Sequence, residues 1–318
     1  MVDDKKKLRV FCGSSNPMLT LEICRHLGVE KGDILVSNFS DGETHVKVNE
    51  SVRGGHVFVI QSTTSPVNES LMKLLIIIDA MKRASASKVT AVIPYYGYSR
   101  QEKKTSGREP VTAKLVANLL TVAGADRVMT VDLHAWAIQG FFDIPVDHLT
   151  ALPIICDYLE SKRTAKGDEM VIVSPDAGGV GRARAFAKRL DTTIAIVDKR
   201  RPKPNVAESM NLIGDVRGKI AVLVDDIIDT AGTITSASKM LLDHGAREIY
   251  VVATHAILSG PACARLKAAP LKEIIVTNTI ALDDKEKPEN LTVLSMAPLI
   301  SEAIYRIYNE IPVSSLFE

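Results

Sequence analysis

Short apolar runs rich in valine and isoleucine recur along the chain, and longer stretches of helical character separate them. The runs show little alternation of apolar and polar residues, which is typical of strands buried on both faces of a sheet. We expect strands over residues 8–13, 33–40, 56–62, 89–95, 128–133, 170–174, 193–198, 220–224, 249–254, 274–277 and 292–295. We expect helices over residues 66–84, 110–123, 152–162, 181–190, 233–244, 262–268 and 298–308. Strands that alternate with helices in this way predict an α/β fold built on mostly parallel sheets.

The same pattern divides the chain into two parts. One series of strands and helices ends near residues 147–151, and a second, similar series begins at Met170. A chain of 318 residues is about twice the usual size of one domain, so two domains are expected. We predict an N-terminal domain over residues 1–149 and a C-terminal domain over residues 150–297. The last helix and the tail, residues 298–318, are expected to pack on the N-terminal domain.

Composition narrows the class of protein without changing the predicted fold. Hydrophobic residues make up 46% of the chain and charged residues 24%, as in ordinary globular proteins. The net charge of +1 gives no overall basic excess of the kind that favours nucleic acid. The apolar runs are too short to span a bilayer, the first residues lack the apolar core of a signal peptide, and the 4 cysteines are scattered. We therefore expect a cytoplasmic protein with no nucleic-acid or membrane partner.

Residues 222–234 carry the most chemistry, with the sequence V-L-V-D-D-I-I-D-T-A-G-T-I. We expect a strand to end at Asp225 and Asp226 and a helix to begin near Thr233. In open α/β sheets, ligands bind at the carboxyl ends of the strands. The loop 229–233 offers a glycine, two hydroxyls and the N–H groups of a helix start, which together favour an anion. The segment therefore predicts a phosphate loop beside two carboxylates that accept hydrogen bonds from sugar hydroxyls. For any one residue alone, the alternative is an ordinary strand end or helix cap.

Two further segments suggest phosphate chemistry. Residues 173–180, V-S-P-D-A-G-G-V, place an acid and two glycines between a strand and a helix, a second anion-binding loop suited to a diphosphate with its metal. Residues 98–109 form a polar, basic loop, and its cationic side chains are of the kind that clamps a transferring phosphoryl group. Taken alone, such a run is more often a solvated basic loop. His134 follows a strand end, where a lone histidine is more often structural than functional.

The three segments resemble one superfamily. Residues 222–234 resemble the phosphoribosyl-diphosphate-binding motif shared by phosphoribosyltransferases and ribose-phosphate diphosphokinases. The order Y-S-R-Q-E-K-K at residues 98–104 is similar to the ATP loop of the diphosphokinases alone. The resemblance extends from Val10 to Phe317 and is close to the phosphate-regulated, hexameric class of that family. It implies two similar domains of the phosphoribosyltransferase type, each a mostly parallel sheet flanked by helices, and a homo-hexamer.

The resemblance also implies a reaction. Members of this family transfer the β,γ-diphosphate of ATP to the anomeric hydroxyl of ribose 5-phosphate, giving 5-phosphoribosyl 1-diphosphate and AMP for nucleotide biosynthesis. Mg²⁺ is the expected cofactor, and phosphate and ADP are the expected effectors. Two alternatives remain open at this point: a phosphoribosyltransferase, which consumes the same diphosphate, and a non-catalytic regulatory relative of the enzyme.

Positions that match the family's motifs are expected to share its roles. The residues expected to bind ATP are Phe39, Asp41, Glu43, Arg100, Gln101 and His134. Those expected to bind ribose 5-phosphate are Asp225, Asp226, Asp229, Thr230, Ala231, Gly232 and Thr233. The diphosphate is expected on Asp176, Ala177, Gly178 and Gly179, and the metal on His134 and Asp176. The catalytic cations are expected to be Lys199, Arg201 and Arg100. The effectors are expected at a subunit interface, on Ser51, Arg53, Ser85, Arg108 and Ser314.

The chain departs from the family's usual pattern at a few positions. Trp136 and Ala137 follow His134-Ala135, where a small residue and a glutamine are common. Thr105 replaces an aspartate of the ATP loop, and Pro312 stands at a serine position of the C-terminal regulatory segment. The first change lies beside the expected ATP site, and the last lies among the expected regulatory residues.

Overall fold

The computed structural model describes residues 8–162, 169–200, 209–282 and 286–316, and it divides the chain into two compact units. The N-terminal unit comprises Met1–Thr150, Thr279–Ala281 and Ser295–Glu318, so the chain returns to it at its end. The C-terminal unit comprises Ala151–Asn278 and Leu282–Leu294. Within the described part of the chain, no helix is both long and apolar enough to cross a membrane.

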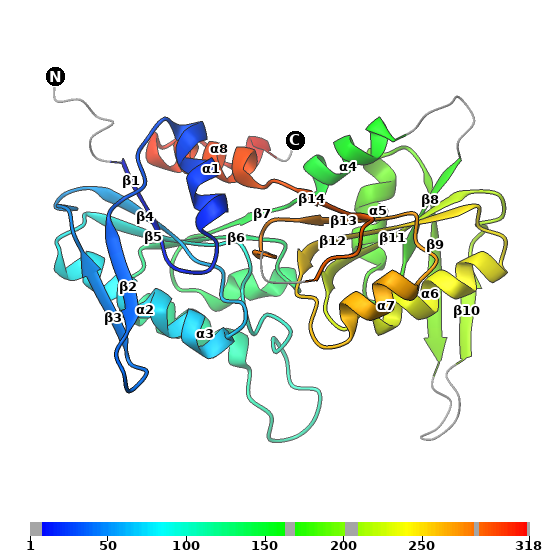
Figure 1. The fold of residues 1–318 in the computed structure, drawn as a ribbon, viewed down its shortest axis with the longest axis horizontal. Coiled ribbons are helices and arrows are strands. Elements are labelled where there is room, and N and C mark those ends of the chain that lie inside the picture. The colour runs from blue at the N-terminus through cyan, green and yellow to red at the C-terminus, as the bar shows by residue number, and fades with distance from the viewer. Residues whose placement is uncertain (1–7, 163–168, 201–208, 283–285, 317–318) are drawn as a thin grey trace. The chain divides into compact units, whose positions relative to one another are not determined.

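The N-terminal unit is built on a parallel sheet of five strands, in the order β1-β4-β5-β6-β7. The strands are β1 (Leu8–Cys12), β4 (His56–Ile60), β5 (Lys88–Ile93), β6 (Arg127–Val131) and β7 (Val146–Leu149). A separate antiparallel hairpin is formed by β2 (Ile34–Asn38) and β3 (Thr44–Val48). The helices are α1 (Pro17–Leu27), α2 (Val67–Arg83), α3 (Thr112–Ala123), the 3-10 helix η2 (Trp136–Phe141), α8 (Ala297–Tyr308) and the 3-10 turn η3 (Ser314–Leu316). Helices α1 and α8 cover one face of the sheet, and α2 and α3 cover the other (Figure 1).

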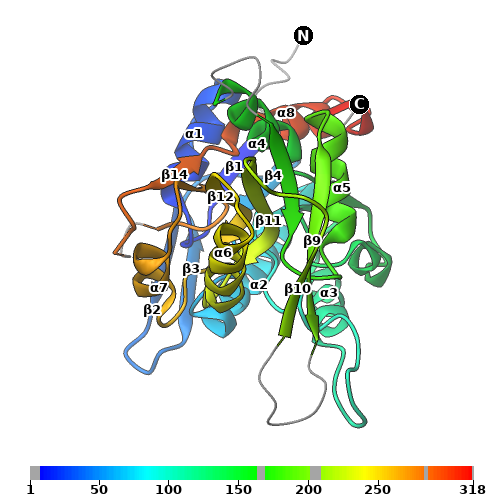
Figure 2. The ribbon, with the colours of Figure 1, turned by 90° about the vertical axis from the view of Figure 1, so that its right-hand side faces the viewer.

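The C-terminal unit is built on a sheet of seven strands, in the order β10-β9-β8-β11-β12-β13-β14. All neighbours are parallel except β10, which runs antiparallel to β9 at one edge (Figure 2). The strands are β8 (Met170–Ser174), β9 (Thr193–Arg200), β10 (Ser209–Ile213), β11 (Ile220–Ile228), β12 (Glu248–Ala256), β13 (Glu273–Thr277) and β14 (Leu291–Leu294). The helices are α4 (Leu152–Ser161), α5 (Val180–Arg189), α6 (Gly232–Asp243) and α7 (Ala262–Ala268). Helices α4 and α5 lie on one face of the sheet, and α6 and α7 lie on the other (Figure 1).

The strands in the middle of each sheet are the most apolar segments of the chain. Every residue of β8 is buried, and β12 is buried after its first residue. Helices on both faces remove these strands from water, so the lack of apolar and polar alternation follows from their position. The predicted α/β class with mostly parallel sheets flanked by helices is confirmed.

Several predicted elements differ from the observed ones. The prediction omitted α1, β3, β7 and β10, and it ended β11 at residue 224. Strand β11 instead continues through both acids, because its ladder with β12 runs on to the pairs Ile227–His255 and Ile228–Ala256. Asp225 and Asp226 are therefore held in a regular strand near its carboxyl end. Helix α6 begins at Gly232 and not at Thr233.

Candidate active site

The two acids of β11 share one arginine from α5. Arg182 places Nη1 at 3.2 Å from Oδ1 of Asp225 and Nη2 at 3.2 Å from Oδ1 of Asp226. The N–H of Asp226 also donates to Oδ1 of Asp225, at 2.8 Å. Asp226 is only 3% exposed, so the positive charge of Arg182 helps to offset the cost of burying its carboxylate. Sequence reasoning missed Arg182, although it lies in the helix that follows the predicted diphosphate loop.

The electrostatics of this pair are unusual for carboxyl groups. Burial is the main cause that raises the pKa of Asp225, and the neighbouring Asp226 adds to it, so that the value reaches about 7. Arg182 opposes both effects because its positive charge favours the ionised form. The pair therefore changes its charge close to neutral pH. When ionised, such a pair can accept hydrogen bonds from hydroxyl groups.

The loop between β11 and α6 is fixed by hydrogen bonds from neighbouring side chains, and its two threonine side chains are exposed to solvent. Ala231 adopts a left-handed conformation with φ of 60°, and Gly232 then begins the helix. The carboxylate of Asp229 accepts a hydrogen bond from the hydroxyl of Ser259, and Arg265 donates to the carbonyl of Thr230 at 3.0 Å. The side chains of Thr230 and Thr233 remain exposed. The N–H groups of a first helical turn have no partner within the helix, so this loop is suited to an anion.

The loop between β8 and α5 has the same construction. Oδ1 of Asp176 accepts the N–H of Gly179 at 2.9 Å, and the hydroxyl of Ser174 donates to the carbonyl of Asp176 at 2.6 Å. A side chain at Gly179 would place its Cβ only 2.8 Å from that hydroxyl oxygen, so glycine is needed there. Asp176, Ala177 and Gly178 are exposed. Because β8 and β11 are parallel neighbours, both loops lie at the same edge of the sheet.

In the N-terminal unit, the residues expected to bind ATP lie on separate segments. Arg100, Gln101 and His134 follow the carboxyl ends of the neighbouring strands β5 and β6. Phe39, Asp41 and Glu43 lie instead at the turn of the β2–β3 hairpin. Phe39 is 53% exposed, with its ring centroid 4.9 Å from that of His45. Asp41 accepts the N–H of Glu43 at 3.0 Å, which shapes the turn.

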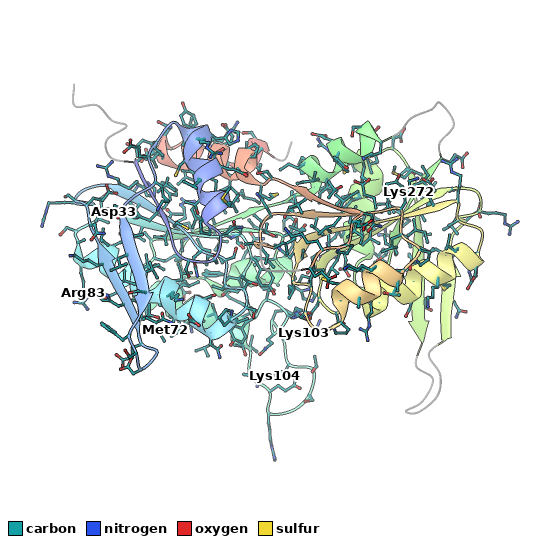
Figure 3. The ribbon with its side chains drawn as sticks, in the orientation of Figure 1. Asp33, Met72, Arg83, Lys103, Lys104 and Lys272 are labelled. Carbon is teal, nitrogen blue, oxygen red and sulfur yellow. The ribbon has the colours of Figure 1, made fainter. Side chains whose placement is uncertain are left out.

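The basic loop between β5 and α3 is stabilised by hydrogen bonds within the loop. The carboxylate of Glu109 accepts hydrogen bonds from the backbone and hydroxyl groups of Thr105 and Ser106, at 2.7 to 3.0 Å. These bonds lower the pKa of Glu109 to about 2. Lys103 and Lys104 extend from this loop into solvent (Figure 3). At the start of the loop, Oε1 of Gln101 accepts a hydrogen bond from Thr112 at 2.6 Å.

Two of the expected catalytic cations, Lys199 and Arg201, belong to the stretch of sequence at the end of β9. Lys199 belongs to β9, where its backbone pairs with Met210, and Arg201 lies outside the described residues. Among the residues described, no group of three or more His, Cys, Asp or Glu side chains could hold a metal ion. The expected metal ligands His134 and Asp176 are both exposed and belong to different units.

Of the expected regulatory residues, Ser51, Arg53 and Ser85 precede the strands β4 and β5, whereas Arg108 lies in the basic loop after β5. The carbonyl of Ser85 accepts the N–H of Gly54 at 2.9 Å, so the segments that carry Arg53 and Ser85 are joined. Beside them is a cavity of about 520 Å³ lined by Gly54, His56, Ser87, Lys88, Tyr308, Asn309 and Glu310. A neighbouring cavity of about 800 Å³ shares His56 and Lys88 and reaches Arg127 and Val313. Burial, followed by the charges of Lys88 and Arg127, lowers the pKa of His56 to about 4.

The chain is similar to known proteins along its whole length. Residues 8–124 match a family model described as the N-terminal domain of ribose phosphate pyrophosphokinase, and residues 199–318 match one described as the phosphoribosyl synthetase-associated domain. A ribose-phosphate pyrophosphokinase of Caldanaerobacter subterraneus subsp. tengcongensis is 59% identical over 310 residues, which cover 98% of each chain. One from Bacillus caldolyticus is 56% identical over 318 residues and covers 100% of each chain. The crystal structure of phosphoribosylpyrophosphate synthetase from Mycobacterium smegmatis aligns with a TM-score of 0.91 at 43% identity, over 96% of this chain and 99% of that chain.

Proposed function

Because this chain belongs to the ribose-phosphate pyrophosphokinase family, we propose that its two units divide the reaction between them. The enzyme transfers the β,γ-diphosphate of ATP to the anomeric hydroxyl of ribose 5-phosphate and releases AMP. The C-terminal unit binds the sugar phosphate and the diphosphate, and the N-terminal unit binds ATP. The observation that carries this proposal is the pair of acids on β11 between two helix-opening loops at one sheet edge.

At the sugar end, each group has a role that its chemistry supports. Residues 229–233 hold the 5-phosphate through N–H and hydroxyl donors, and Asp225 and Asp226 accept hydrogen bonds from the ribose hydroxyls. The anomeric oxygen then attacks the β-phosphorus in line and loses its proton. The bond from that phosphorus to the oxygen shared with the α-phosphate breaks, which releases AMP. Binding both partners in this geometry supplies much of the rate, because phosphoryl transfer depends on positioning and charge neutralisation.

The residues expected at the diphosphate fit a magnesium ion that is bound together with its substrate. Mg²⁺ is usually held by one or two carboxylates and by substrate phosphates, and seldom by a cage of protein ligands. Asp176 offers an exposed carboxylate beside an anion loop, and His134 is the second proposed ligand. When bound, the ion offsets negative charge on the phosphates. Lys199, Arg201 and Arg100 are proposed to supply further positive charge during transfer, and Phe39, Asp41, Glu43 and Gln101 to contact the remainder of ATP.

A product assay with ATP, Mg²⁺ and ribose 5-phosphate tests the reaction. We expect AMP and 5-phosphoribosyl 1-diphosphate to appear in equal amounts, and phosphorus NMR measures both products. ADP in place of AMP would mean attack at the γ-phosphorus. A requirement for a nucleobase without ATP would indicate a phosphoribosyltransferase, and substrate binding without turnover would indicate a non-catalytic relative.

Phosphate and ADP are proposed as effectors on Ser51, Arg53, Ser85, Arg108 and Ser314. The joined segments of Arg53 and Ser85, beside a cavity that contains Lys88, support this proposal. We expect Arg53→Ala to raise the phosphate concentration needed for half-maximal activation by about tenfold, the effect of one lost charge-assisted hydrogen bond. Initial rates over a phosphate series measure this. Arg83→Ala is the matched control, since Arg83 is an exposed arginine paired with Asp79 on α2 (Figure 3). Equal phosphate responses in both variants would contradict the effector site.

A homo-hexamer in the cytoplasm is proposed as the working form. Three apolar side chains on α3, Leu115, Leu119 and Val122, are 54%, 38% and 85% exposed at helical spacing. Met72 on α2 is also exposed, at 53% (Figure 3). Apolar surface of this kind is a common feature of subunit interfaces.

Two glutamate substitutions on α3 test whether this helix lies in the subunit interface. We expect Leu119→Glu with Val122→Glu to lower the particle mass in light scattering, because charges are costly in the core of an interface. Ile213→Glu is the control, since Ile213 is an exposed residue of the edge strand β10 in the other unit. An unchanged mass in the α3 variant would remove this helix from the interface.

A further inference from the structure

The side chain of His148 contacts the turn that leads to His134. Strand β6 ends at Val131, and the next two N–H groups are both bound by β7. The N–H of Asp132 donates to the carbonyl of Leu149 at 3.0 Å. The N–H of Leu133 donates to Nε2 of His148 at 2.8 Å. The histidine ring therefore extends the hydrogen bonding between the two strands by one step beyond the end of the sheet.

These two bonds enclose a strained position of the backbone. Asp132 has φ of 38°, a region that non-glycine residues rarely adopt and that costs on the order of the energy of one hydrogen bond. Leu133 is only 4% exposed, so its N–H needs a partner within the protein. The ring of His148 is that partner. Without it, the turn loses a contact that helps to hold the strained conformation, and the next residue is His134.

The ring of His148 is itself held in place by η2. The indole of Trp136 meets it edge-on, with ring centroids 4.7 Å apart and planes at 70°. Nε2 of Gln139 lies 3.2 Å from Nδ1 of the ring and donates to the carbonyl of Trp136 at 3.3 Å. Because Nε2 of His148 accepts the N–H of Leu133, the ring proton is on Nδ1, and Gln139 packs against the ring without donating to it. Trp136 is 72% exposed, an unusual place for so large an apolar side chain. Its contact with His148 gives this residue a structural task in the turn.

We propose that His148 is a positioning residue for MgATP binding, which fixes the turn of His134, and that Trp136 holds the His148 ring in the required orientation. The inference rests on the proposed placement of ATP at His134. His148 would act through the turn and not by contact with ATP, so loss of the ring acceptor should weaken ATP binding indirectly. It also explains what Trp136 does beside the ATP site.

Steady-state kinetics with both substrates test the proposal. His148→Leu removes the acceptor, and we expect the KM for MgATP to rise about tenfold, as for one lost hydrogen bond. The KM for ribose 5-phosphate should stay within about twofold, because its proposed residues belong to the other unit. His148→Gln restores an acceptor oxygen and should recover part of the loss. Trp136→Ala should raise the KM for MgATP less than His148→Leu, and the double variant should be no worse than His148→Leu alone, since the two residues act through one contact.

Fluorescence gives a readout that does not depend on turnover. Trp136 is the single tryptophan of the chain, so its emission reports on this contact directly. We expect MgATP to change the emission of the wild-type enzyme, with a midpoint that moves about tenfold higher in His148→Leu. Equal increases in both KM values, or an unchanged midpoint with a lowered melting temperature, would overturn the positioning role. His134→Ala distinguishes a failure of the proposed ATP site from a failure of the positioning role of His148. If it leaves ATP affinity unaltered, the ATP site and the positioning role both fail. If it weakens ATP binding and His148→Leu does not, only the positioning role fails.

Discussion

Replacing Asp225 and Asp226 together by asparagine is expected to lower kcat/KM for ribose 5-phosphate by about a hundredfold. Each ionised carboxylate that accepts a hydrogen bond from a sugar hydroxyl is worth about 1.3 kcal/mol over a neutral acceptor, and the two losses add to about 2.7 kcal/mol. Asparagine keeps the size and shape of aspartate, so the strand ladder with β12 should persist. Initial rates at saturating MgATP with varied ribose 5-phosphate give the measurement.

The matched control for this double variant is Asp157→Asn. Asp157 also pairs with an arginine of α5, Arg189, at 3.2 Å, but its side chain is 73% exposed. An exposed pair of this kind contributes little, so activity and stability should both stay close to wild type. If the double variant keeps the wild-type kcat/KM for ribose 5-phosphate, the sugar does not bind at Asp225 and Asp226, whatever the control shows.

The parts of the fold that hydrophobic runs predicted best lie in or against the sheet centres. The observed bounds of β8 and α7 are the predicted ones, because an isolated apolar run or a clear helical period leaves little choice. Strand β7 has only four residues, V-D-H-L, and such a short run has no clear period. Helix α1 was missed although Asn16 caps it and Pro17 opens it. The helix-start signal of Asn16 and Pro17 is present in the sequence, but it comes only a few residues after the end of β1 and was overlooked for that reason.

The candidate site shows a different limit. The motif at residues 222–234 predicted an anion loop beside both acids from local chemistry alone, and their part in binding stays a prediction. It placed the strand end wrongly, because the end depends on how far the neighbour β12 continues. Arg182 lies 43 residues from Asp225 in sequence, and their contact depends on β8 pairing with β11. Strand order of this kind is a property of the whole sheet, so no local pattern indicates it.

Arg182→Met is expected to be the most damaging single change at the site outside the proposed ligands. It leaves the almost fully buried Asp226 without the guanidinium that offsets its charge, and such a loss is costly because the remaining carboxylate stays desolvated. We expect the free energy of unfolding to fall by about 2 kcal/mol, a figure reduced for the partial exposure of the arginine. At pH 7, kcat/KM for ribose 5-phosphate should fall by about fivefold or more, because a pKa about one unit higher leaves about a tenth of Asp225 ionised in place of about half.

The dependence on pH gives the sharper test. The pKa of Asp225 is raised to about 7 in the folded protein, so the folded state binds this proton more tightly than the unfolded chain. The stability that this group contributes is therefore fully present below about pH 4 and is lost as the pH rises through about 7. Ribose binding has the opposite trend, since the ionised acid is the better acceptor, and kcat/KM should rise from pH 6 to 8. Without Arg182 the pKa of Asp225 rises further, so this rise in kcat/KM should move upward by about one pH unit or more.

Two variants distinguish a specific role of Arg182 from a general loss of structure. Arg182→Lys keeps the positive charge but lacks the planar fork that reaches both acids, so its pH profile should lie between those of the wild type and Arg182→Met. Arg189→Met removes the exposed arginine of the same helix and should leave the profile unmoved. A profile that stays at its wild-type position in Arg182→Met would show that this arginine does not set the charge of Asp225. The acids would then have to be held by groups other than Arg182.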